Sequence, residues 1–289
     1  MIRFDLEDVP PGLRLGTSSF SSADWHGGFY PEGLPPAEFL LHYSSQLPTV
    51  EIDATWHMMP SVRMVKAWAE KTPESFVFAL KVPKVITHEL YLEDCTDEWN
   101  QFVRALEPLG TKLGPVLLQF QYVAKGKDPE EYRTGARFRE RLARFLDLVP
   151  SGMRVAVEVR NEKWLGDPLY DLLRTHNVAL ALTAFYTMPS GPSLLAKANV
   201  VTADFSYLRF LGNHKSMDEA VANAREEGKR RGDWDSIIVD RTEEMRPWLP
   251  AIRDLLASKQ DVFTYFNNHY AGFAPGSIDL FLRLWRGQV

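Results

Sequence analysis

The stretch Val155-Ala156-Val157-Glu158-Val159-Arg160 places two opposite charges in an otherwise apolar run. A run this rich in β-branched residues is typical of a strand that is covered on both faces, as in a parallel sheet. Side chains alternate across a strand, so the three valines face one way while Glu158 and Arg160 face the other. If the valines pack on helices, both charges point into the sheet or barrel. They do so at its carboxyl end, where such folds hold their ligands.

Seven other runs have the composition of buried strands, and helical spacing of apolar residues separates most of them. The strand runs are Leu13–Ser18, Thr49–Asp53, Phe76–Val82, Val116–Phe120, Val178–Thr183, Tyr207–Phe210 and Val262–Phe266. The helical runs are Pro36–Gln46, Ser61–Lys71, Trp99–Leu109, Arg137–Leu148, Leu169–Thr175, Met217–Arg231, Thr242–Ser258 and Gly276–Trp285. We expect Ser61 to cap its helix, a polar loop at Lys125–Tyr132, and a long, lid-like loop at Ala184–Asp204.

Eight strand-then-helix units in a chain of this length predict a single (β/α)8 TIM-type barrel that spans residues 1–289. A doubly wound open sheet is the alternative. It is less well supported because no G-x-G-x-x-G sequence follows the first strand.

Composition limits the class of protein. The chain has 289 residues, 45% hydrophobic and 25% charged, so it can bury a full core. Its net charge of -5 gives no global basic field for a nucleic acid. The single cysteine, Cys95, fits a reducing compartment, and no signal peptide or apolar run of about 18 residues occurs. We therefore expect a soluble cytoplasmic protein, monomeric or weakly oligomeric, without membrane contact.

Strand phase places a set of polar residues inside the barrel, at or near the carboxyl ends of six strands. The set is Glu51, Asp53, Lys81, Gln119, Glu158, Arg160, Arg209 and Asn267. One hypothesis is an active site, and the other is a structural ion network, since buried charges persist when they are paired. The two differ in the expected effect of Glu158→Gln and Glu51→Gln. Loss of an active-site carboxylate is often neutral for stability, whereas breaking a buried pair costs about 3–5 kcal/mol.

In the active-site hypothesis, Glu158 is the general acid/base and Glu51 its counterpart. Lys81 and the arginines Arg209 and Arg160 suit a carboxylate or phosphate, and Gln119 with Asn267 would orient hydroxyls. Lys81 is also a candidate Schiff-base amine, or serves only to balance Glu51. One of the arginines is expected to pair with Glu158.

The loops after the strands carry further candidates. His88 is either an acid/base group or a surface residue, and His57 and His269 are comparable. Trp25, Trp56 and Trp164 suit stacking on a sugar or base, or simple packing. The strand ends at Thr17, Ser18, Asp53 and Asn268 complete the expected ligand-binding set. Cys95 lies among acidic residues, which disfavours a reactive thiolate.

A divalent metal site is the main rival interpretation. Oxygen and nitrogen ligands come from Glu51, Asp53, His57, Glu158 and His269, as in isomerase- or endonuclease-like barrels. Three cations, Lys81, Arg160 and Arg209, are expected around the same centre and would repel a metal ion. No H-x-H or H-E-x-x-H spacing occurs. We therefore assign no cofactor and leave a divalent metal open.

Several motifs, in order along nearly the whole chain, resemble the YecE-like family, known as domain of unknown function 72. They are LGTSS at 15, FYPEGLP at 29, VEIDATW at 50, FALKVPKVITHE at 78, LGPVLLQF at 113, VAVEVRNEKW at 155, YLRFLG at 207 and YFNNH at 265. The resemblance implies a TIM-type barrel, and the activity of the family is not established. The chain departs from the family pattern at Ser19-Phe20, Asp53, Trp56-His57, Asn161 and Leu211. The resemblance therefore identifies no catalytic histidine.

These observations favour an enzyme that acts on a small anionic metabolite, such as a sugar acid or sugar phosphate, with hydrolase, lyase and isomerase chemistry all open. Two carboxylates also suit glycoside hydrolysis. A nucleic acid-binding protein would use the basic helices at Arg137–Arg144 and Arg225–Arg231. Their arginines alternate with glutamates, which favours a solvated helix face. A non-catalytic ligand sensor is the third possibility.

Overall fold

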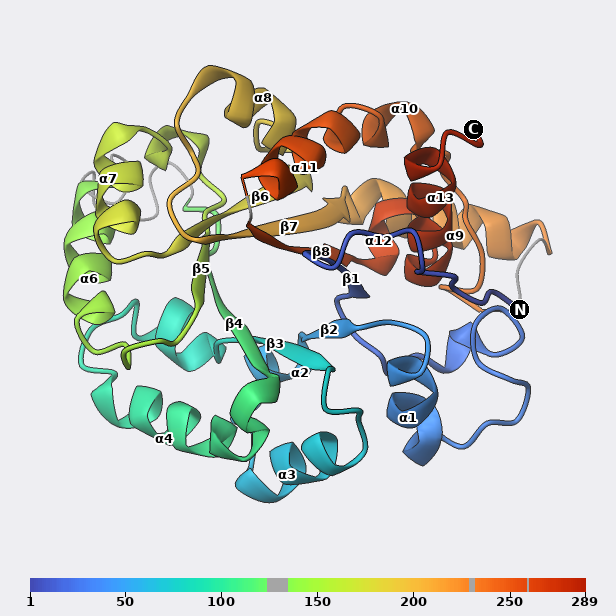
Figure 1. The fold of residues 1–289 in the computed structure, drawn as a ribbon, viewed down its shortest axis with the longest axis horizontal. Coiled ribbons are helices and arrows are strands. Elements are labelled where there is room, and N and C mark those ends of the chain that lie inside the picture. Colours follow the sequence, from blue (N-terminus) through green and yellow to red (C-terminus); the bar gives the residue numbers. More distant parts are fainter. Residues whose placement is uncertain (124–134, 229–231, 259) are drawn as a thin grey trace.

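The eight predicted runs form eight parallel strands arranged in a ring, drawn as arrows in Figure 1. Each strand from β2 to β7 pairs with the next one along the chain, and β8 pairs with β1. The strands are β1 Leu13–Thr17, β2 Thr49–Ile52, β3 Val77–Lys81, β4 Leu113–Gln119, β5 Val155–Glu158, β6 Ala179–Phe185, β7 Phe205–Gly212 and β8 Asp261–Phe266. The last strand returns to the first, so the predicted TIM-type barrel is confirmed over the doubly wound sheet.

The computed structural model describes residues 1–123, 135–228, 232–258 and 260–289. The predicted polar loop Lys125–Tyr132 lies outside these residues, as does the end of the predicted helix Met217–Arg231.

Helices surround the strands (Figure 1). They are α1 Phe39–Ser44, α2 Ala54–His57, α3 Val62–Glu70, α4 Thr96–Leu106, α6 Ala136–Leu146, α7 Asp167–Thr175, α8 Gly191–Lys197, α9 His214–Glu226, α10 Thr242–Met245, α11 Trp248–Ala257, α12 Asn268–Ala271 and α13 Ala274–Trp285. Short 3-10 turns lie at η1 Ala23–Trp25, η2 Pro36–Glu38, η4 Glu107–Lys112 and η5 Glu162–Trp164, and a π-helical turn, η3, at Val85–Glu89. Among the described residues, no helix is both long and apolar enough to cross a bilayer.

The two faces of the strands belong to two separate cores, as the opening stretch predicts. Val155, Val157 and Val159 lie in the outer core, with the apolar faces of the surrounding helices. Ala156 lies in the inner core, inside the barrel, with aromatic side chains such as Tyr207. Strand β5 ends at Glu158, two residues earlier than predicted. Glu158 and Arg160 nevertheless keep the inward phase, because both charges meet inside the ring.

Two sequence predictions about helices need correction. The expected long loop at Ala184–Asp204 contains α8, which begins after Ser190, whose hydroxyl accepts from Ser193 N. Pro192 lies in its first turn, where proline is tolerated. The predicted helix Thr242–Ser258 is two helices, α10 and α11, separated at Pro247. The capping role of Ser61 is confirmed, because its hydroxyl accepts from Met64 N.

Strands β1 and β2 close the ring without a backbone ladder. In the described chain no backbone hydrogen bond joins them, and the hydroxyl of Tyr43, from α1, fills the gap. It accepts from Thr17 N at 2.8 Å and donates to Thr49 O at 3.1 Å. Gly16 permits this approach, because a Cβ there would lie 2.3 Å from Thr49 O. The lack of a side chain at Gly16 thus makes room for the neighbouring strand.

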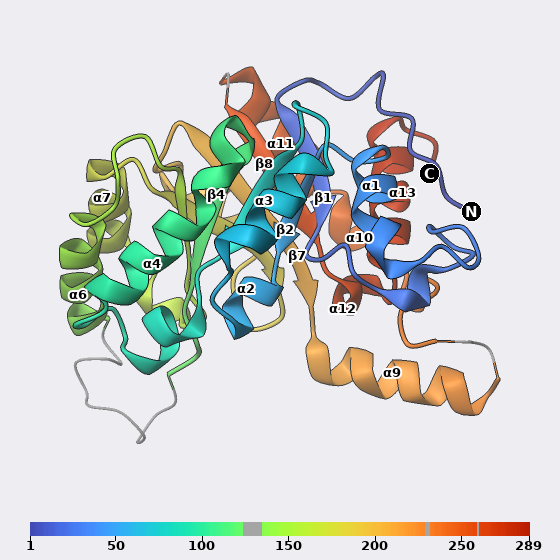
Figure 2. The same cartoon turned by 90° about the horizontal axis from the view of Figure 1, so that it is seen from below.

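The carboxyl ends of all eight strands open onto one end of the barrel, the mouth. Figure 2 shows strand β7 running toward α9, which projects beyond the barrel at this end. The candidate residues of the sequence analysis lie at or beneath this mouth.

Candidate functional site

A buried arginine between two carboxylates forms the floor of the mouth. Arg209 of β7 contacts Glu51 of β2 at 2.7 Å through Nη2, and Glu158 of β5 at 2.5 Å through Nη1. Both carboxylates are fully buried, and Arg209 is 2% exposed. Tyr207, two residues before Arg209, donates its hydroxyl to the second oxygen of Glu51 at 2.7 Å. The charged side chains of β2, β5 and β7 thus pair with one another inside the ring.

Arg160 completes this floor and balances its charge. Its Nη2 lies 2.6 Å from Glu158 Oε1, and its guanidinium carbon lies 3.8 Å from the centroid of the Phe185 ring. Burial opposes ionisation of Glu158, but the charges of Arg160 and Arg209 outweigh it and lower its pKa to about 2. Glu158 is therefore ionised at neutral pH and accepts a proton poorly. The prediction that an arginine pairs with Glu158 is confirmed for Arg160 and Arg209.

The sequence analysis considered Glu51 as the partner of Lys81, and the structure shows a different one. Its ammonium contacts Asp53 at 2.9 Å, not Glu51, and lies 4.9 Å from the centroid of the Trp56 ring. The Asp53 side chain is 35% exposed. Burial raises the pKa of Asp53, but the adjacent ammonium outweighs burial and holds this pKa below its ordinary value. Asp53 and Lys81 each line a cavity at the mouth, whereas Glu51 and Glu158 lie beneath these cavities.

Two of the cavities at the mouth contain candidate residues of the sequence analysis. The larger, here called the cationic cavity, has a volume of about 570 Å³. Lys81, Arg160 and Gln119 line it, together with aromatic rings and further polar groups. The other lining residues are Trp56, Gln121, Tyr122, Phe185, Tyr186, Thr187 and His214. Neither Glu51 nor Glu158 is among them, so a ligand in this cavity meets the cations before the buried carboxylates.

The smaller cavity, here called the serine cavity, has a volume of about 260 Å³ and lies above β1 and β8. It contains five of the predicted ligand-binding residues, Thr17, Ser18, Asp53, Asn267 and Asn268. The other lining residues are Ser19, Ser21, Ser22, Trp25, Trp234, Phe266, His269 and Ala274.

The two asparagines already have internal partners. The side-chain oxygen of Asn267 accepts from His269 N at 2.9 Å. That of Asn268 accepts from Trp25 Nε1 at 3.3 Å and Ala274 N at 3.0 Å. Asn267 thus caps α12, and Asn268 ties the start of α12 to Trp25 and to the start of α13.

The candidate histidines lie apart from one another. His88 is bonded to the Thr87 hydroxyl at 2.7 Å and packs edge-on against Trp56. Burial and the charges of Lys81 and Arg160 lower the pKa of His88 to about 4. His57 packs against the same Trp56 ring. His269 stacks on His214, with 4.2 Å between ring centroids, and contacts Asp218.

The side chains that the sequence suggests as metal ligands do not come together around one point. Among the described residues, no group of three or more His, Cys, Asp or Glu side chains is arranged to hold a metal ion. Glu51 and Glu158 contact Arg209, and Asp53 contacts Lys81. Each carboxylate is thus directed at a cation of the protein.

Other predicted residues have structural roles. Trp25 is 1% exposed and packs against Phe29, although an edge of it reaches the serine cavity. Trp164 is buried and stacks on Phe138, so it belongs to the packing. Trp56 is the one of these three tryptophans that lines the cationic cavity. Burial raises the pKa of Cys95 to about 11, which agrees with the prediction of an unreactive thiol.

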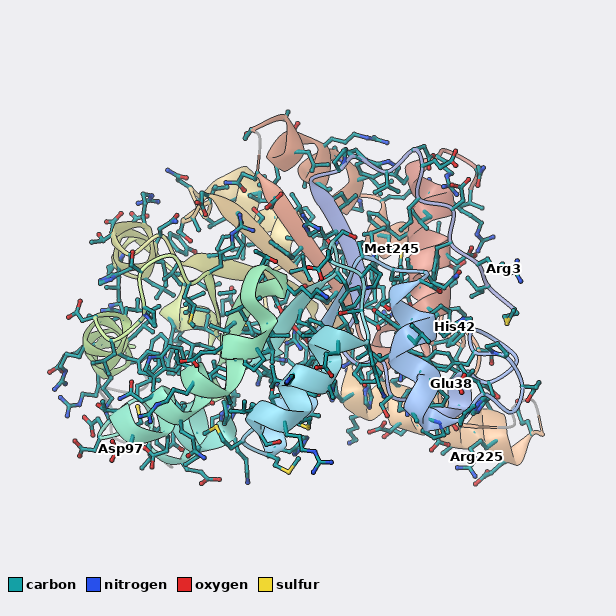
Figure 3. The ribbon with its side chains drawn as sticks, turned by 60° about the horizontal axis from the view of Figure 1, so that its bottom comes forward. Arg3, Glu38, His42, Asp97, Arg225 and Met245 are labelled. Carbon is teal, nitrogen blue, oxygen red and sulfur yellow. The ribbon has the colours of Figure 1, made fainter. Side chains whose placement is uncertain are left out.

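Four of the five arginines that the structure describes in the two basic helices are paired with acidic residues. Arg137 and Arg141 of α6 contact Glu93, and Arg144 contacts Glu140. Arg225 of α9 contacts Asp233, and Figure 3 shows its side chain at the outer edge of the molecule. This pattern agrees with the solvated helix faces expected from the sequence.

Sequence reasoning missed Tyr207, Tyr265 and His214. Strand phase contained a signal for the tyrosines, because Tyr207 shares a face with Arg209, and Tyr265 shares a face with Asn267. Tyr265 bonds Thr49 Oγ1 at 2.8 Å across the closing strands. No comparable signal marks His214, because its place depends on how α9 leaves β7.

Two curated relatives match by sequence. The UPF0759 protein YecE of Escherichia coli K12 is 30% identical over 125 residues, which make up 43% of this chain and 42% of that protein. The UPF0759 protein YunF of Bacillus subtilis is 24% identical over 294 aligned positions, with 89% of this chain and 96% of that protein covered. The chain thus spans less than half the length of the first relative.

Solved structures extend the likeness to the fold. A DUF72 family protein from Thermotoga maritima superposes with a TM-score of 0.71 at 25% identity and covers 95% of this chain and 99% of its own. One from Enterococcus faecalis has a TM-score of 0.68 at 22% identity, over 95% of both chains. The family model described as "Protein of unknown function DUF72" matches residues 14–289. The chain therefore belongs to the DUF72 family.

Proposed function

We propose that this protein is an enzyme that acts on a small anionic metabolite, a sugar acid or a sugar phosphate, at the barrel mouth. The observation that carries the proposal is the pair of cations, Lys81 and Arg160, that line one cavity of about 570 Å³. Two charge-assisted donors on one cavity suit a carboxylate or a phosphate. The cavity also carries aromatic rings, which suit the apolar face of a sugar.

The buried floor has a supporting role in this proposal. Arg209 is almost fully buried and committed to two carboxylates, so it orients them instead of binding the anion. Glu158, with a pKa of about 2, holds Arg160 at the cavity wall and does not transfer a proton at neutral pH. These assignments move the anion contact and the proton transfer away from the buried groups that the sequence favoured.

The Asp53–Lys81 pair is better suited to proton transfer. Its carboxylate is partly exposed and borders the serine cavity, and its ammonium lines the cationic cavity. The lowered pKa of Asp53 keeps it ionised at neutral pH and makes it a weak base, but unlike Glu158 it is exposed where a substrate group can reach it. Lys81 would stabilise negative charge that develops on the substrate beside it.

The test is calorimetric titration with glucose 6-phosphate, 6-phosphogluconate, gluconate and glucuronate, and with glucose as the neutral reference. We expect at least one anion to bind, and glucose to bind at least tenfold more weakly. Lys81→Met and Arg160→Met should each weaken anion binding at least tenfold. Lys66→Met serves as the control, because Lys66 is an exposed lysine of α3 in a surface pair with Glu70.

Two results would count against the proposal. Equal affinity for glucose and for its anionic relatives would remove the role of the cations. Unchanged affinity in the Lys81 and Arg160 variants, with native circular dichroism, would place the anion elsewhere. Proton NMR of the bound ligand after long incubation then distinguishes an enzyme from a ligand sensor, because only an enzyme converts the ligand.

A further inference from the structure

The two cavities of the mouth meet at two places. At the first, Asp53 lines the serine cavity and Lys81 the cationic cavity, and the two side chains are bonded at 2.9 Å. At the second, His269 lines the serine cavity and His214 the cationic cavity, and their rings stack. Asp53 and His269 both line the serine cavity, so both meeting places lie on its wall.

The serine cavity contains a polar group without a partner. Ser18 is 4% exposed, and its hydroxyl oxygen has no hydrogen-bond partner within the described part of the chain. A buried hydroxyl left unpaired is unfavourable, and such groups in folded proteins usually meet a partner that comes from outside the chain. The oxygen itself is closed to solvent, so a ligand in the cavity that Ser18 lines reaches it through a rotation of the side chain.

The chemistry of the serine cavity differs from that of its neighbour. Ser19, Ser21 and Ser22 add hydroxyls beside Ser18, and each hydroxyl can both donate and accept. The half-buried Trp234 ring forms part of the wall, 4.4 Å from the His269 ring between centroids. Among the described residues that line it there is no arginine or lysine, and the one carboxylate, Asp53, is already paired with Lys81. Hydroxyls beside an aromatic ring suit a neutral sugar and not a second anion.

We propose that the serine cavity is a sugar subsite and that the full substrate is an anionic glycoside. In this arrangement a neutral sugar ring lies in the serine cavity, and the sugar that carries the phosphate or carboxylate lies in the cationic cavity. The linkage between them passes over the Asp53–Lys81 pair. The combined size of the cavities falls within the range of about 300–1,000 Å³ typical of small-molecule sites. This inference rests on the proposed function, because it needs the anion in the cationic cavity.

The test compares one-sugar and two-sugar anions by calorimetry. The disaccharide probes are the 6-phosphates of cellobiose, maltose and lactose, and cellobiouronic acid as the carboxylate. Glucose 6-phosphate and glucuronate are the one-sugar probes. We expect at least one disaccharide anion to bind tenfold or more tightly than the one-sugar anion with the same charged group. Whichever series binds more tightly, the phosphates or the carboxylates, identifies the charged group of the substrate.

Variants of the serine cavity sharpen the test. Ser18→Ala removes an unpaired hydroxyl, so the variant should fold as well as the parent and lose at least fivefold in affinity for the best disaccharide. Its affinity for the one-sugar anion should change less than twofold. Trp234→Leu, which removes the aromatic wall, should behave in the same way. Ser45→Ala, at an exposed serine after α1, is the matched control.

The outcomes separate the two proposals. If no anionic sugar binds, the proposed function fails and this inference fails with it. If one-sugar anions bind but no disaccharide binds more tightly, only the sugar subsite is wrong. Equal losses for one-sugar and two-sugar anions in Ser18→Ala and Trp234→Leu would also overturn the subsite.

Discussion

Arg209 determines the chemistry available at the floor of the mouth. Its guanidinium contacts two fully buried carboxylates, and Arg160 supplies the second positive charge. Burial alone would favour a protonated Glu158, but the two guanidinium groups outweigh it and lower its pKa to about 2. The floor thus sets two guanidinium groups against two carboxyl groups, so that their formal charges cancel. Such a set can orient a neighbouring group at the cavity without changing its own protonation state.

Removing one charge from this floor should be costly for stability. Glu158→Gln leaves Arg160 without its carboxylate and takes one of two carboxylates from Arg209, in a region closed to water. We expect a loss of about 3–5 kcal/mol in the free energy of unfolding. Urea denaturation measures it, with Glu162→Gln at an exposed position as the control, for which about 0.5 kcal/mol or less is expected. A loss below about 1 kcal/mol for Glu158→Gln would instead favour an easily removed active-site carboxylate.

The sequence predicts which way these side chains face, but not which ones meet. Alternation along β5 places Glu158 and Arg160 inside, and this is correct. The partner of Lys81 depends on register. Because Ile52 lies beside Leu80, the next residue, Asp53, comes level with Lys81, and Glu51 lies lower in the barrel. Register between strands from distant parts of a sequence is not visible in their composition.

At the scale of elements, the closure between β1 and β2 is the unusual feature of the barrel. The other neighbouring strands share backbone ladders, whereas Tyr43 joins this pair through its hydroxyl. The absence of a side chain at Gly16 lets the strands approach, and Thr49 extends the contact to Tyr265. Closure of the barrel between β1 and β2 therefore depends on a few side-chain hydrogen bonds instead of a ladder of backbone hydrogen bonds.

This closure should be sensitive to small changes. In Gly16→Ala the new Cβ would meet a backbone oxygen at 2.3 Å, and a backbone atom cannot move aside as a flexible side chain can. We expect a loss of about 3 kcal/mol, the upper part of the range for overpacking. Tyr43→Phe leaves Thr17 N–H without its partner and should cost about 1–3 kcal/mol.

Urea denaturation tests both variants, with the exposed Tyr122→Phe as the control for a lost phenol hydroxyl. A parent-like midpoint in Gly16→Ala would mean that β1 and β2 can separate without loss. The closure would then contribute little to the fold.

The eight strands were predictable because each is a distinct apolar run, and their order along the chain is the order around the ring. Helices were less certain where proline intervenes. The expected loop at Ala184–Asp204 includes Pro192, although proline fits the first turn of α8. The expected helix at Thr242–Ser258 includes Pro247, although this proline separates α10 from α11. Proline is tolerated in the first turn of a helix but breaks a helix in its interior. The sequence pattern does not show which of these two positions each proline takes.

At the scale of the whole molecule, the mouth combines residues from every part of the chain. Eight repeated units and the family resemblance predict the barrel, and the barrel then predicts that inward charges at strand ends converge. The division of the mouth into two cavities was not predictable. It depends on the placing of Trp234, from the segment after α9, and of His214, at the first turn of α9. Loop conformations of this kind follow from tertiary packing, which strand and helix periodicity do not encode.

The folded state as a whole should lose stability in acid, in two separate pH ranges. The pKa of His88 is about 4 in the folded protein, against an ordinary value of 6.5, so between these values mainly the unfolded chain binds the proton. The stability that depends on a neutral His88 is therefore fully present above pH 6.5 and is lost as the pH falls toward 4. Glu158 follows at lower pH. Its pKa of about 2 lies below the ordinary 4.5, so its contribution is present above pH 4.5 and is lost toward pH 2.

Urea denaturation at pH 7.5, 5.5 and 4.0 measures the first range. In His88→Gln the unfolded chain no longer takes up this proton, so the fall in unfolding free energy between pH 7.5 and 4.0 should shrink. The expected reduction is about 1–2 kcal/mol after allowance for the partial exposure of the ring. His214, whose pKa burial and the neighbouring His269 and Arg160 lower to about 4, should contribute in the same direction. If the curves of parent and His88→Gln run parallel from pH 7.5 to 4.0, His88 takes up its proton in the folded state as well. Burial of the ring and the charges of Lys81 and Arg160 would then lower the pKa of His88 far less than the structure implies.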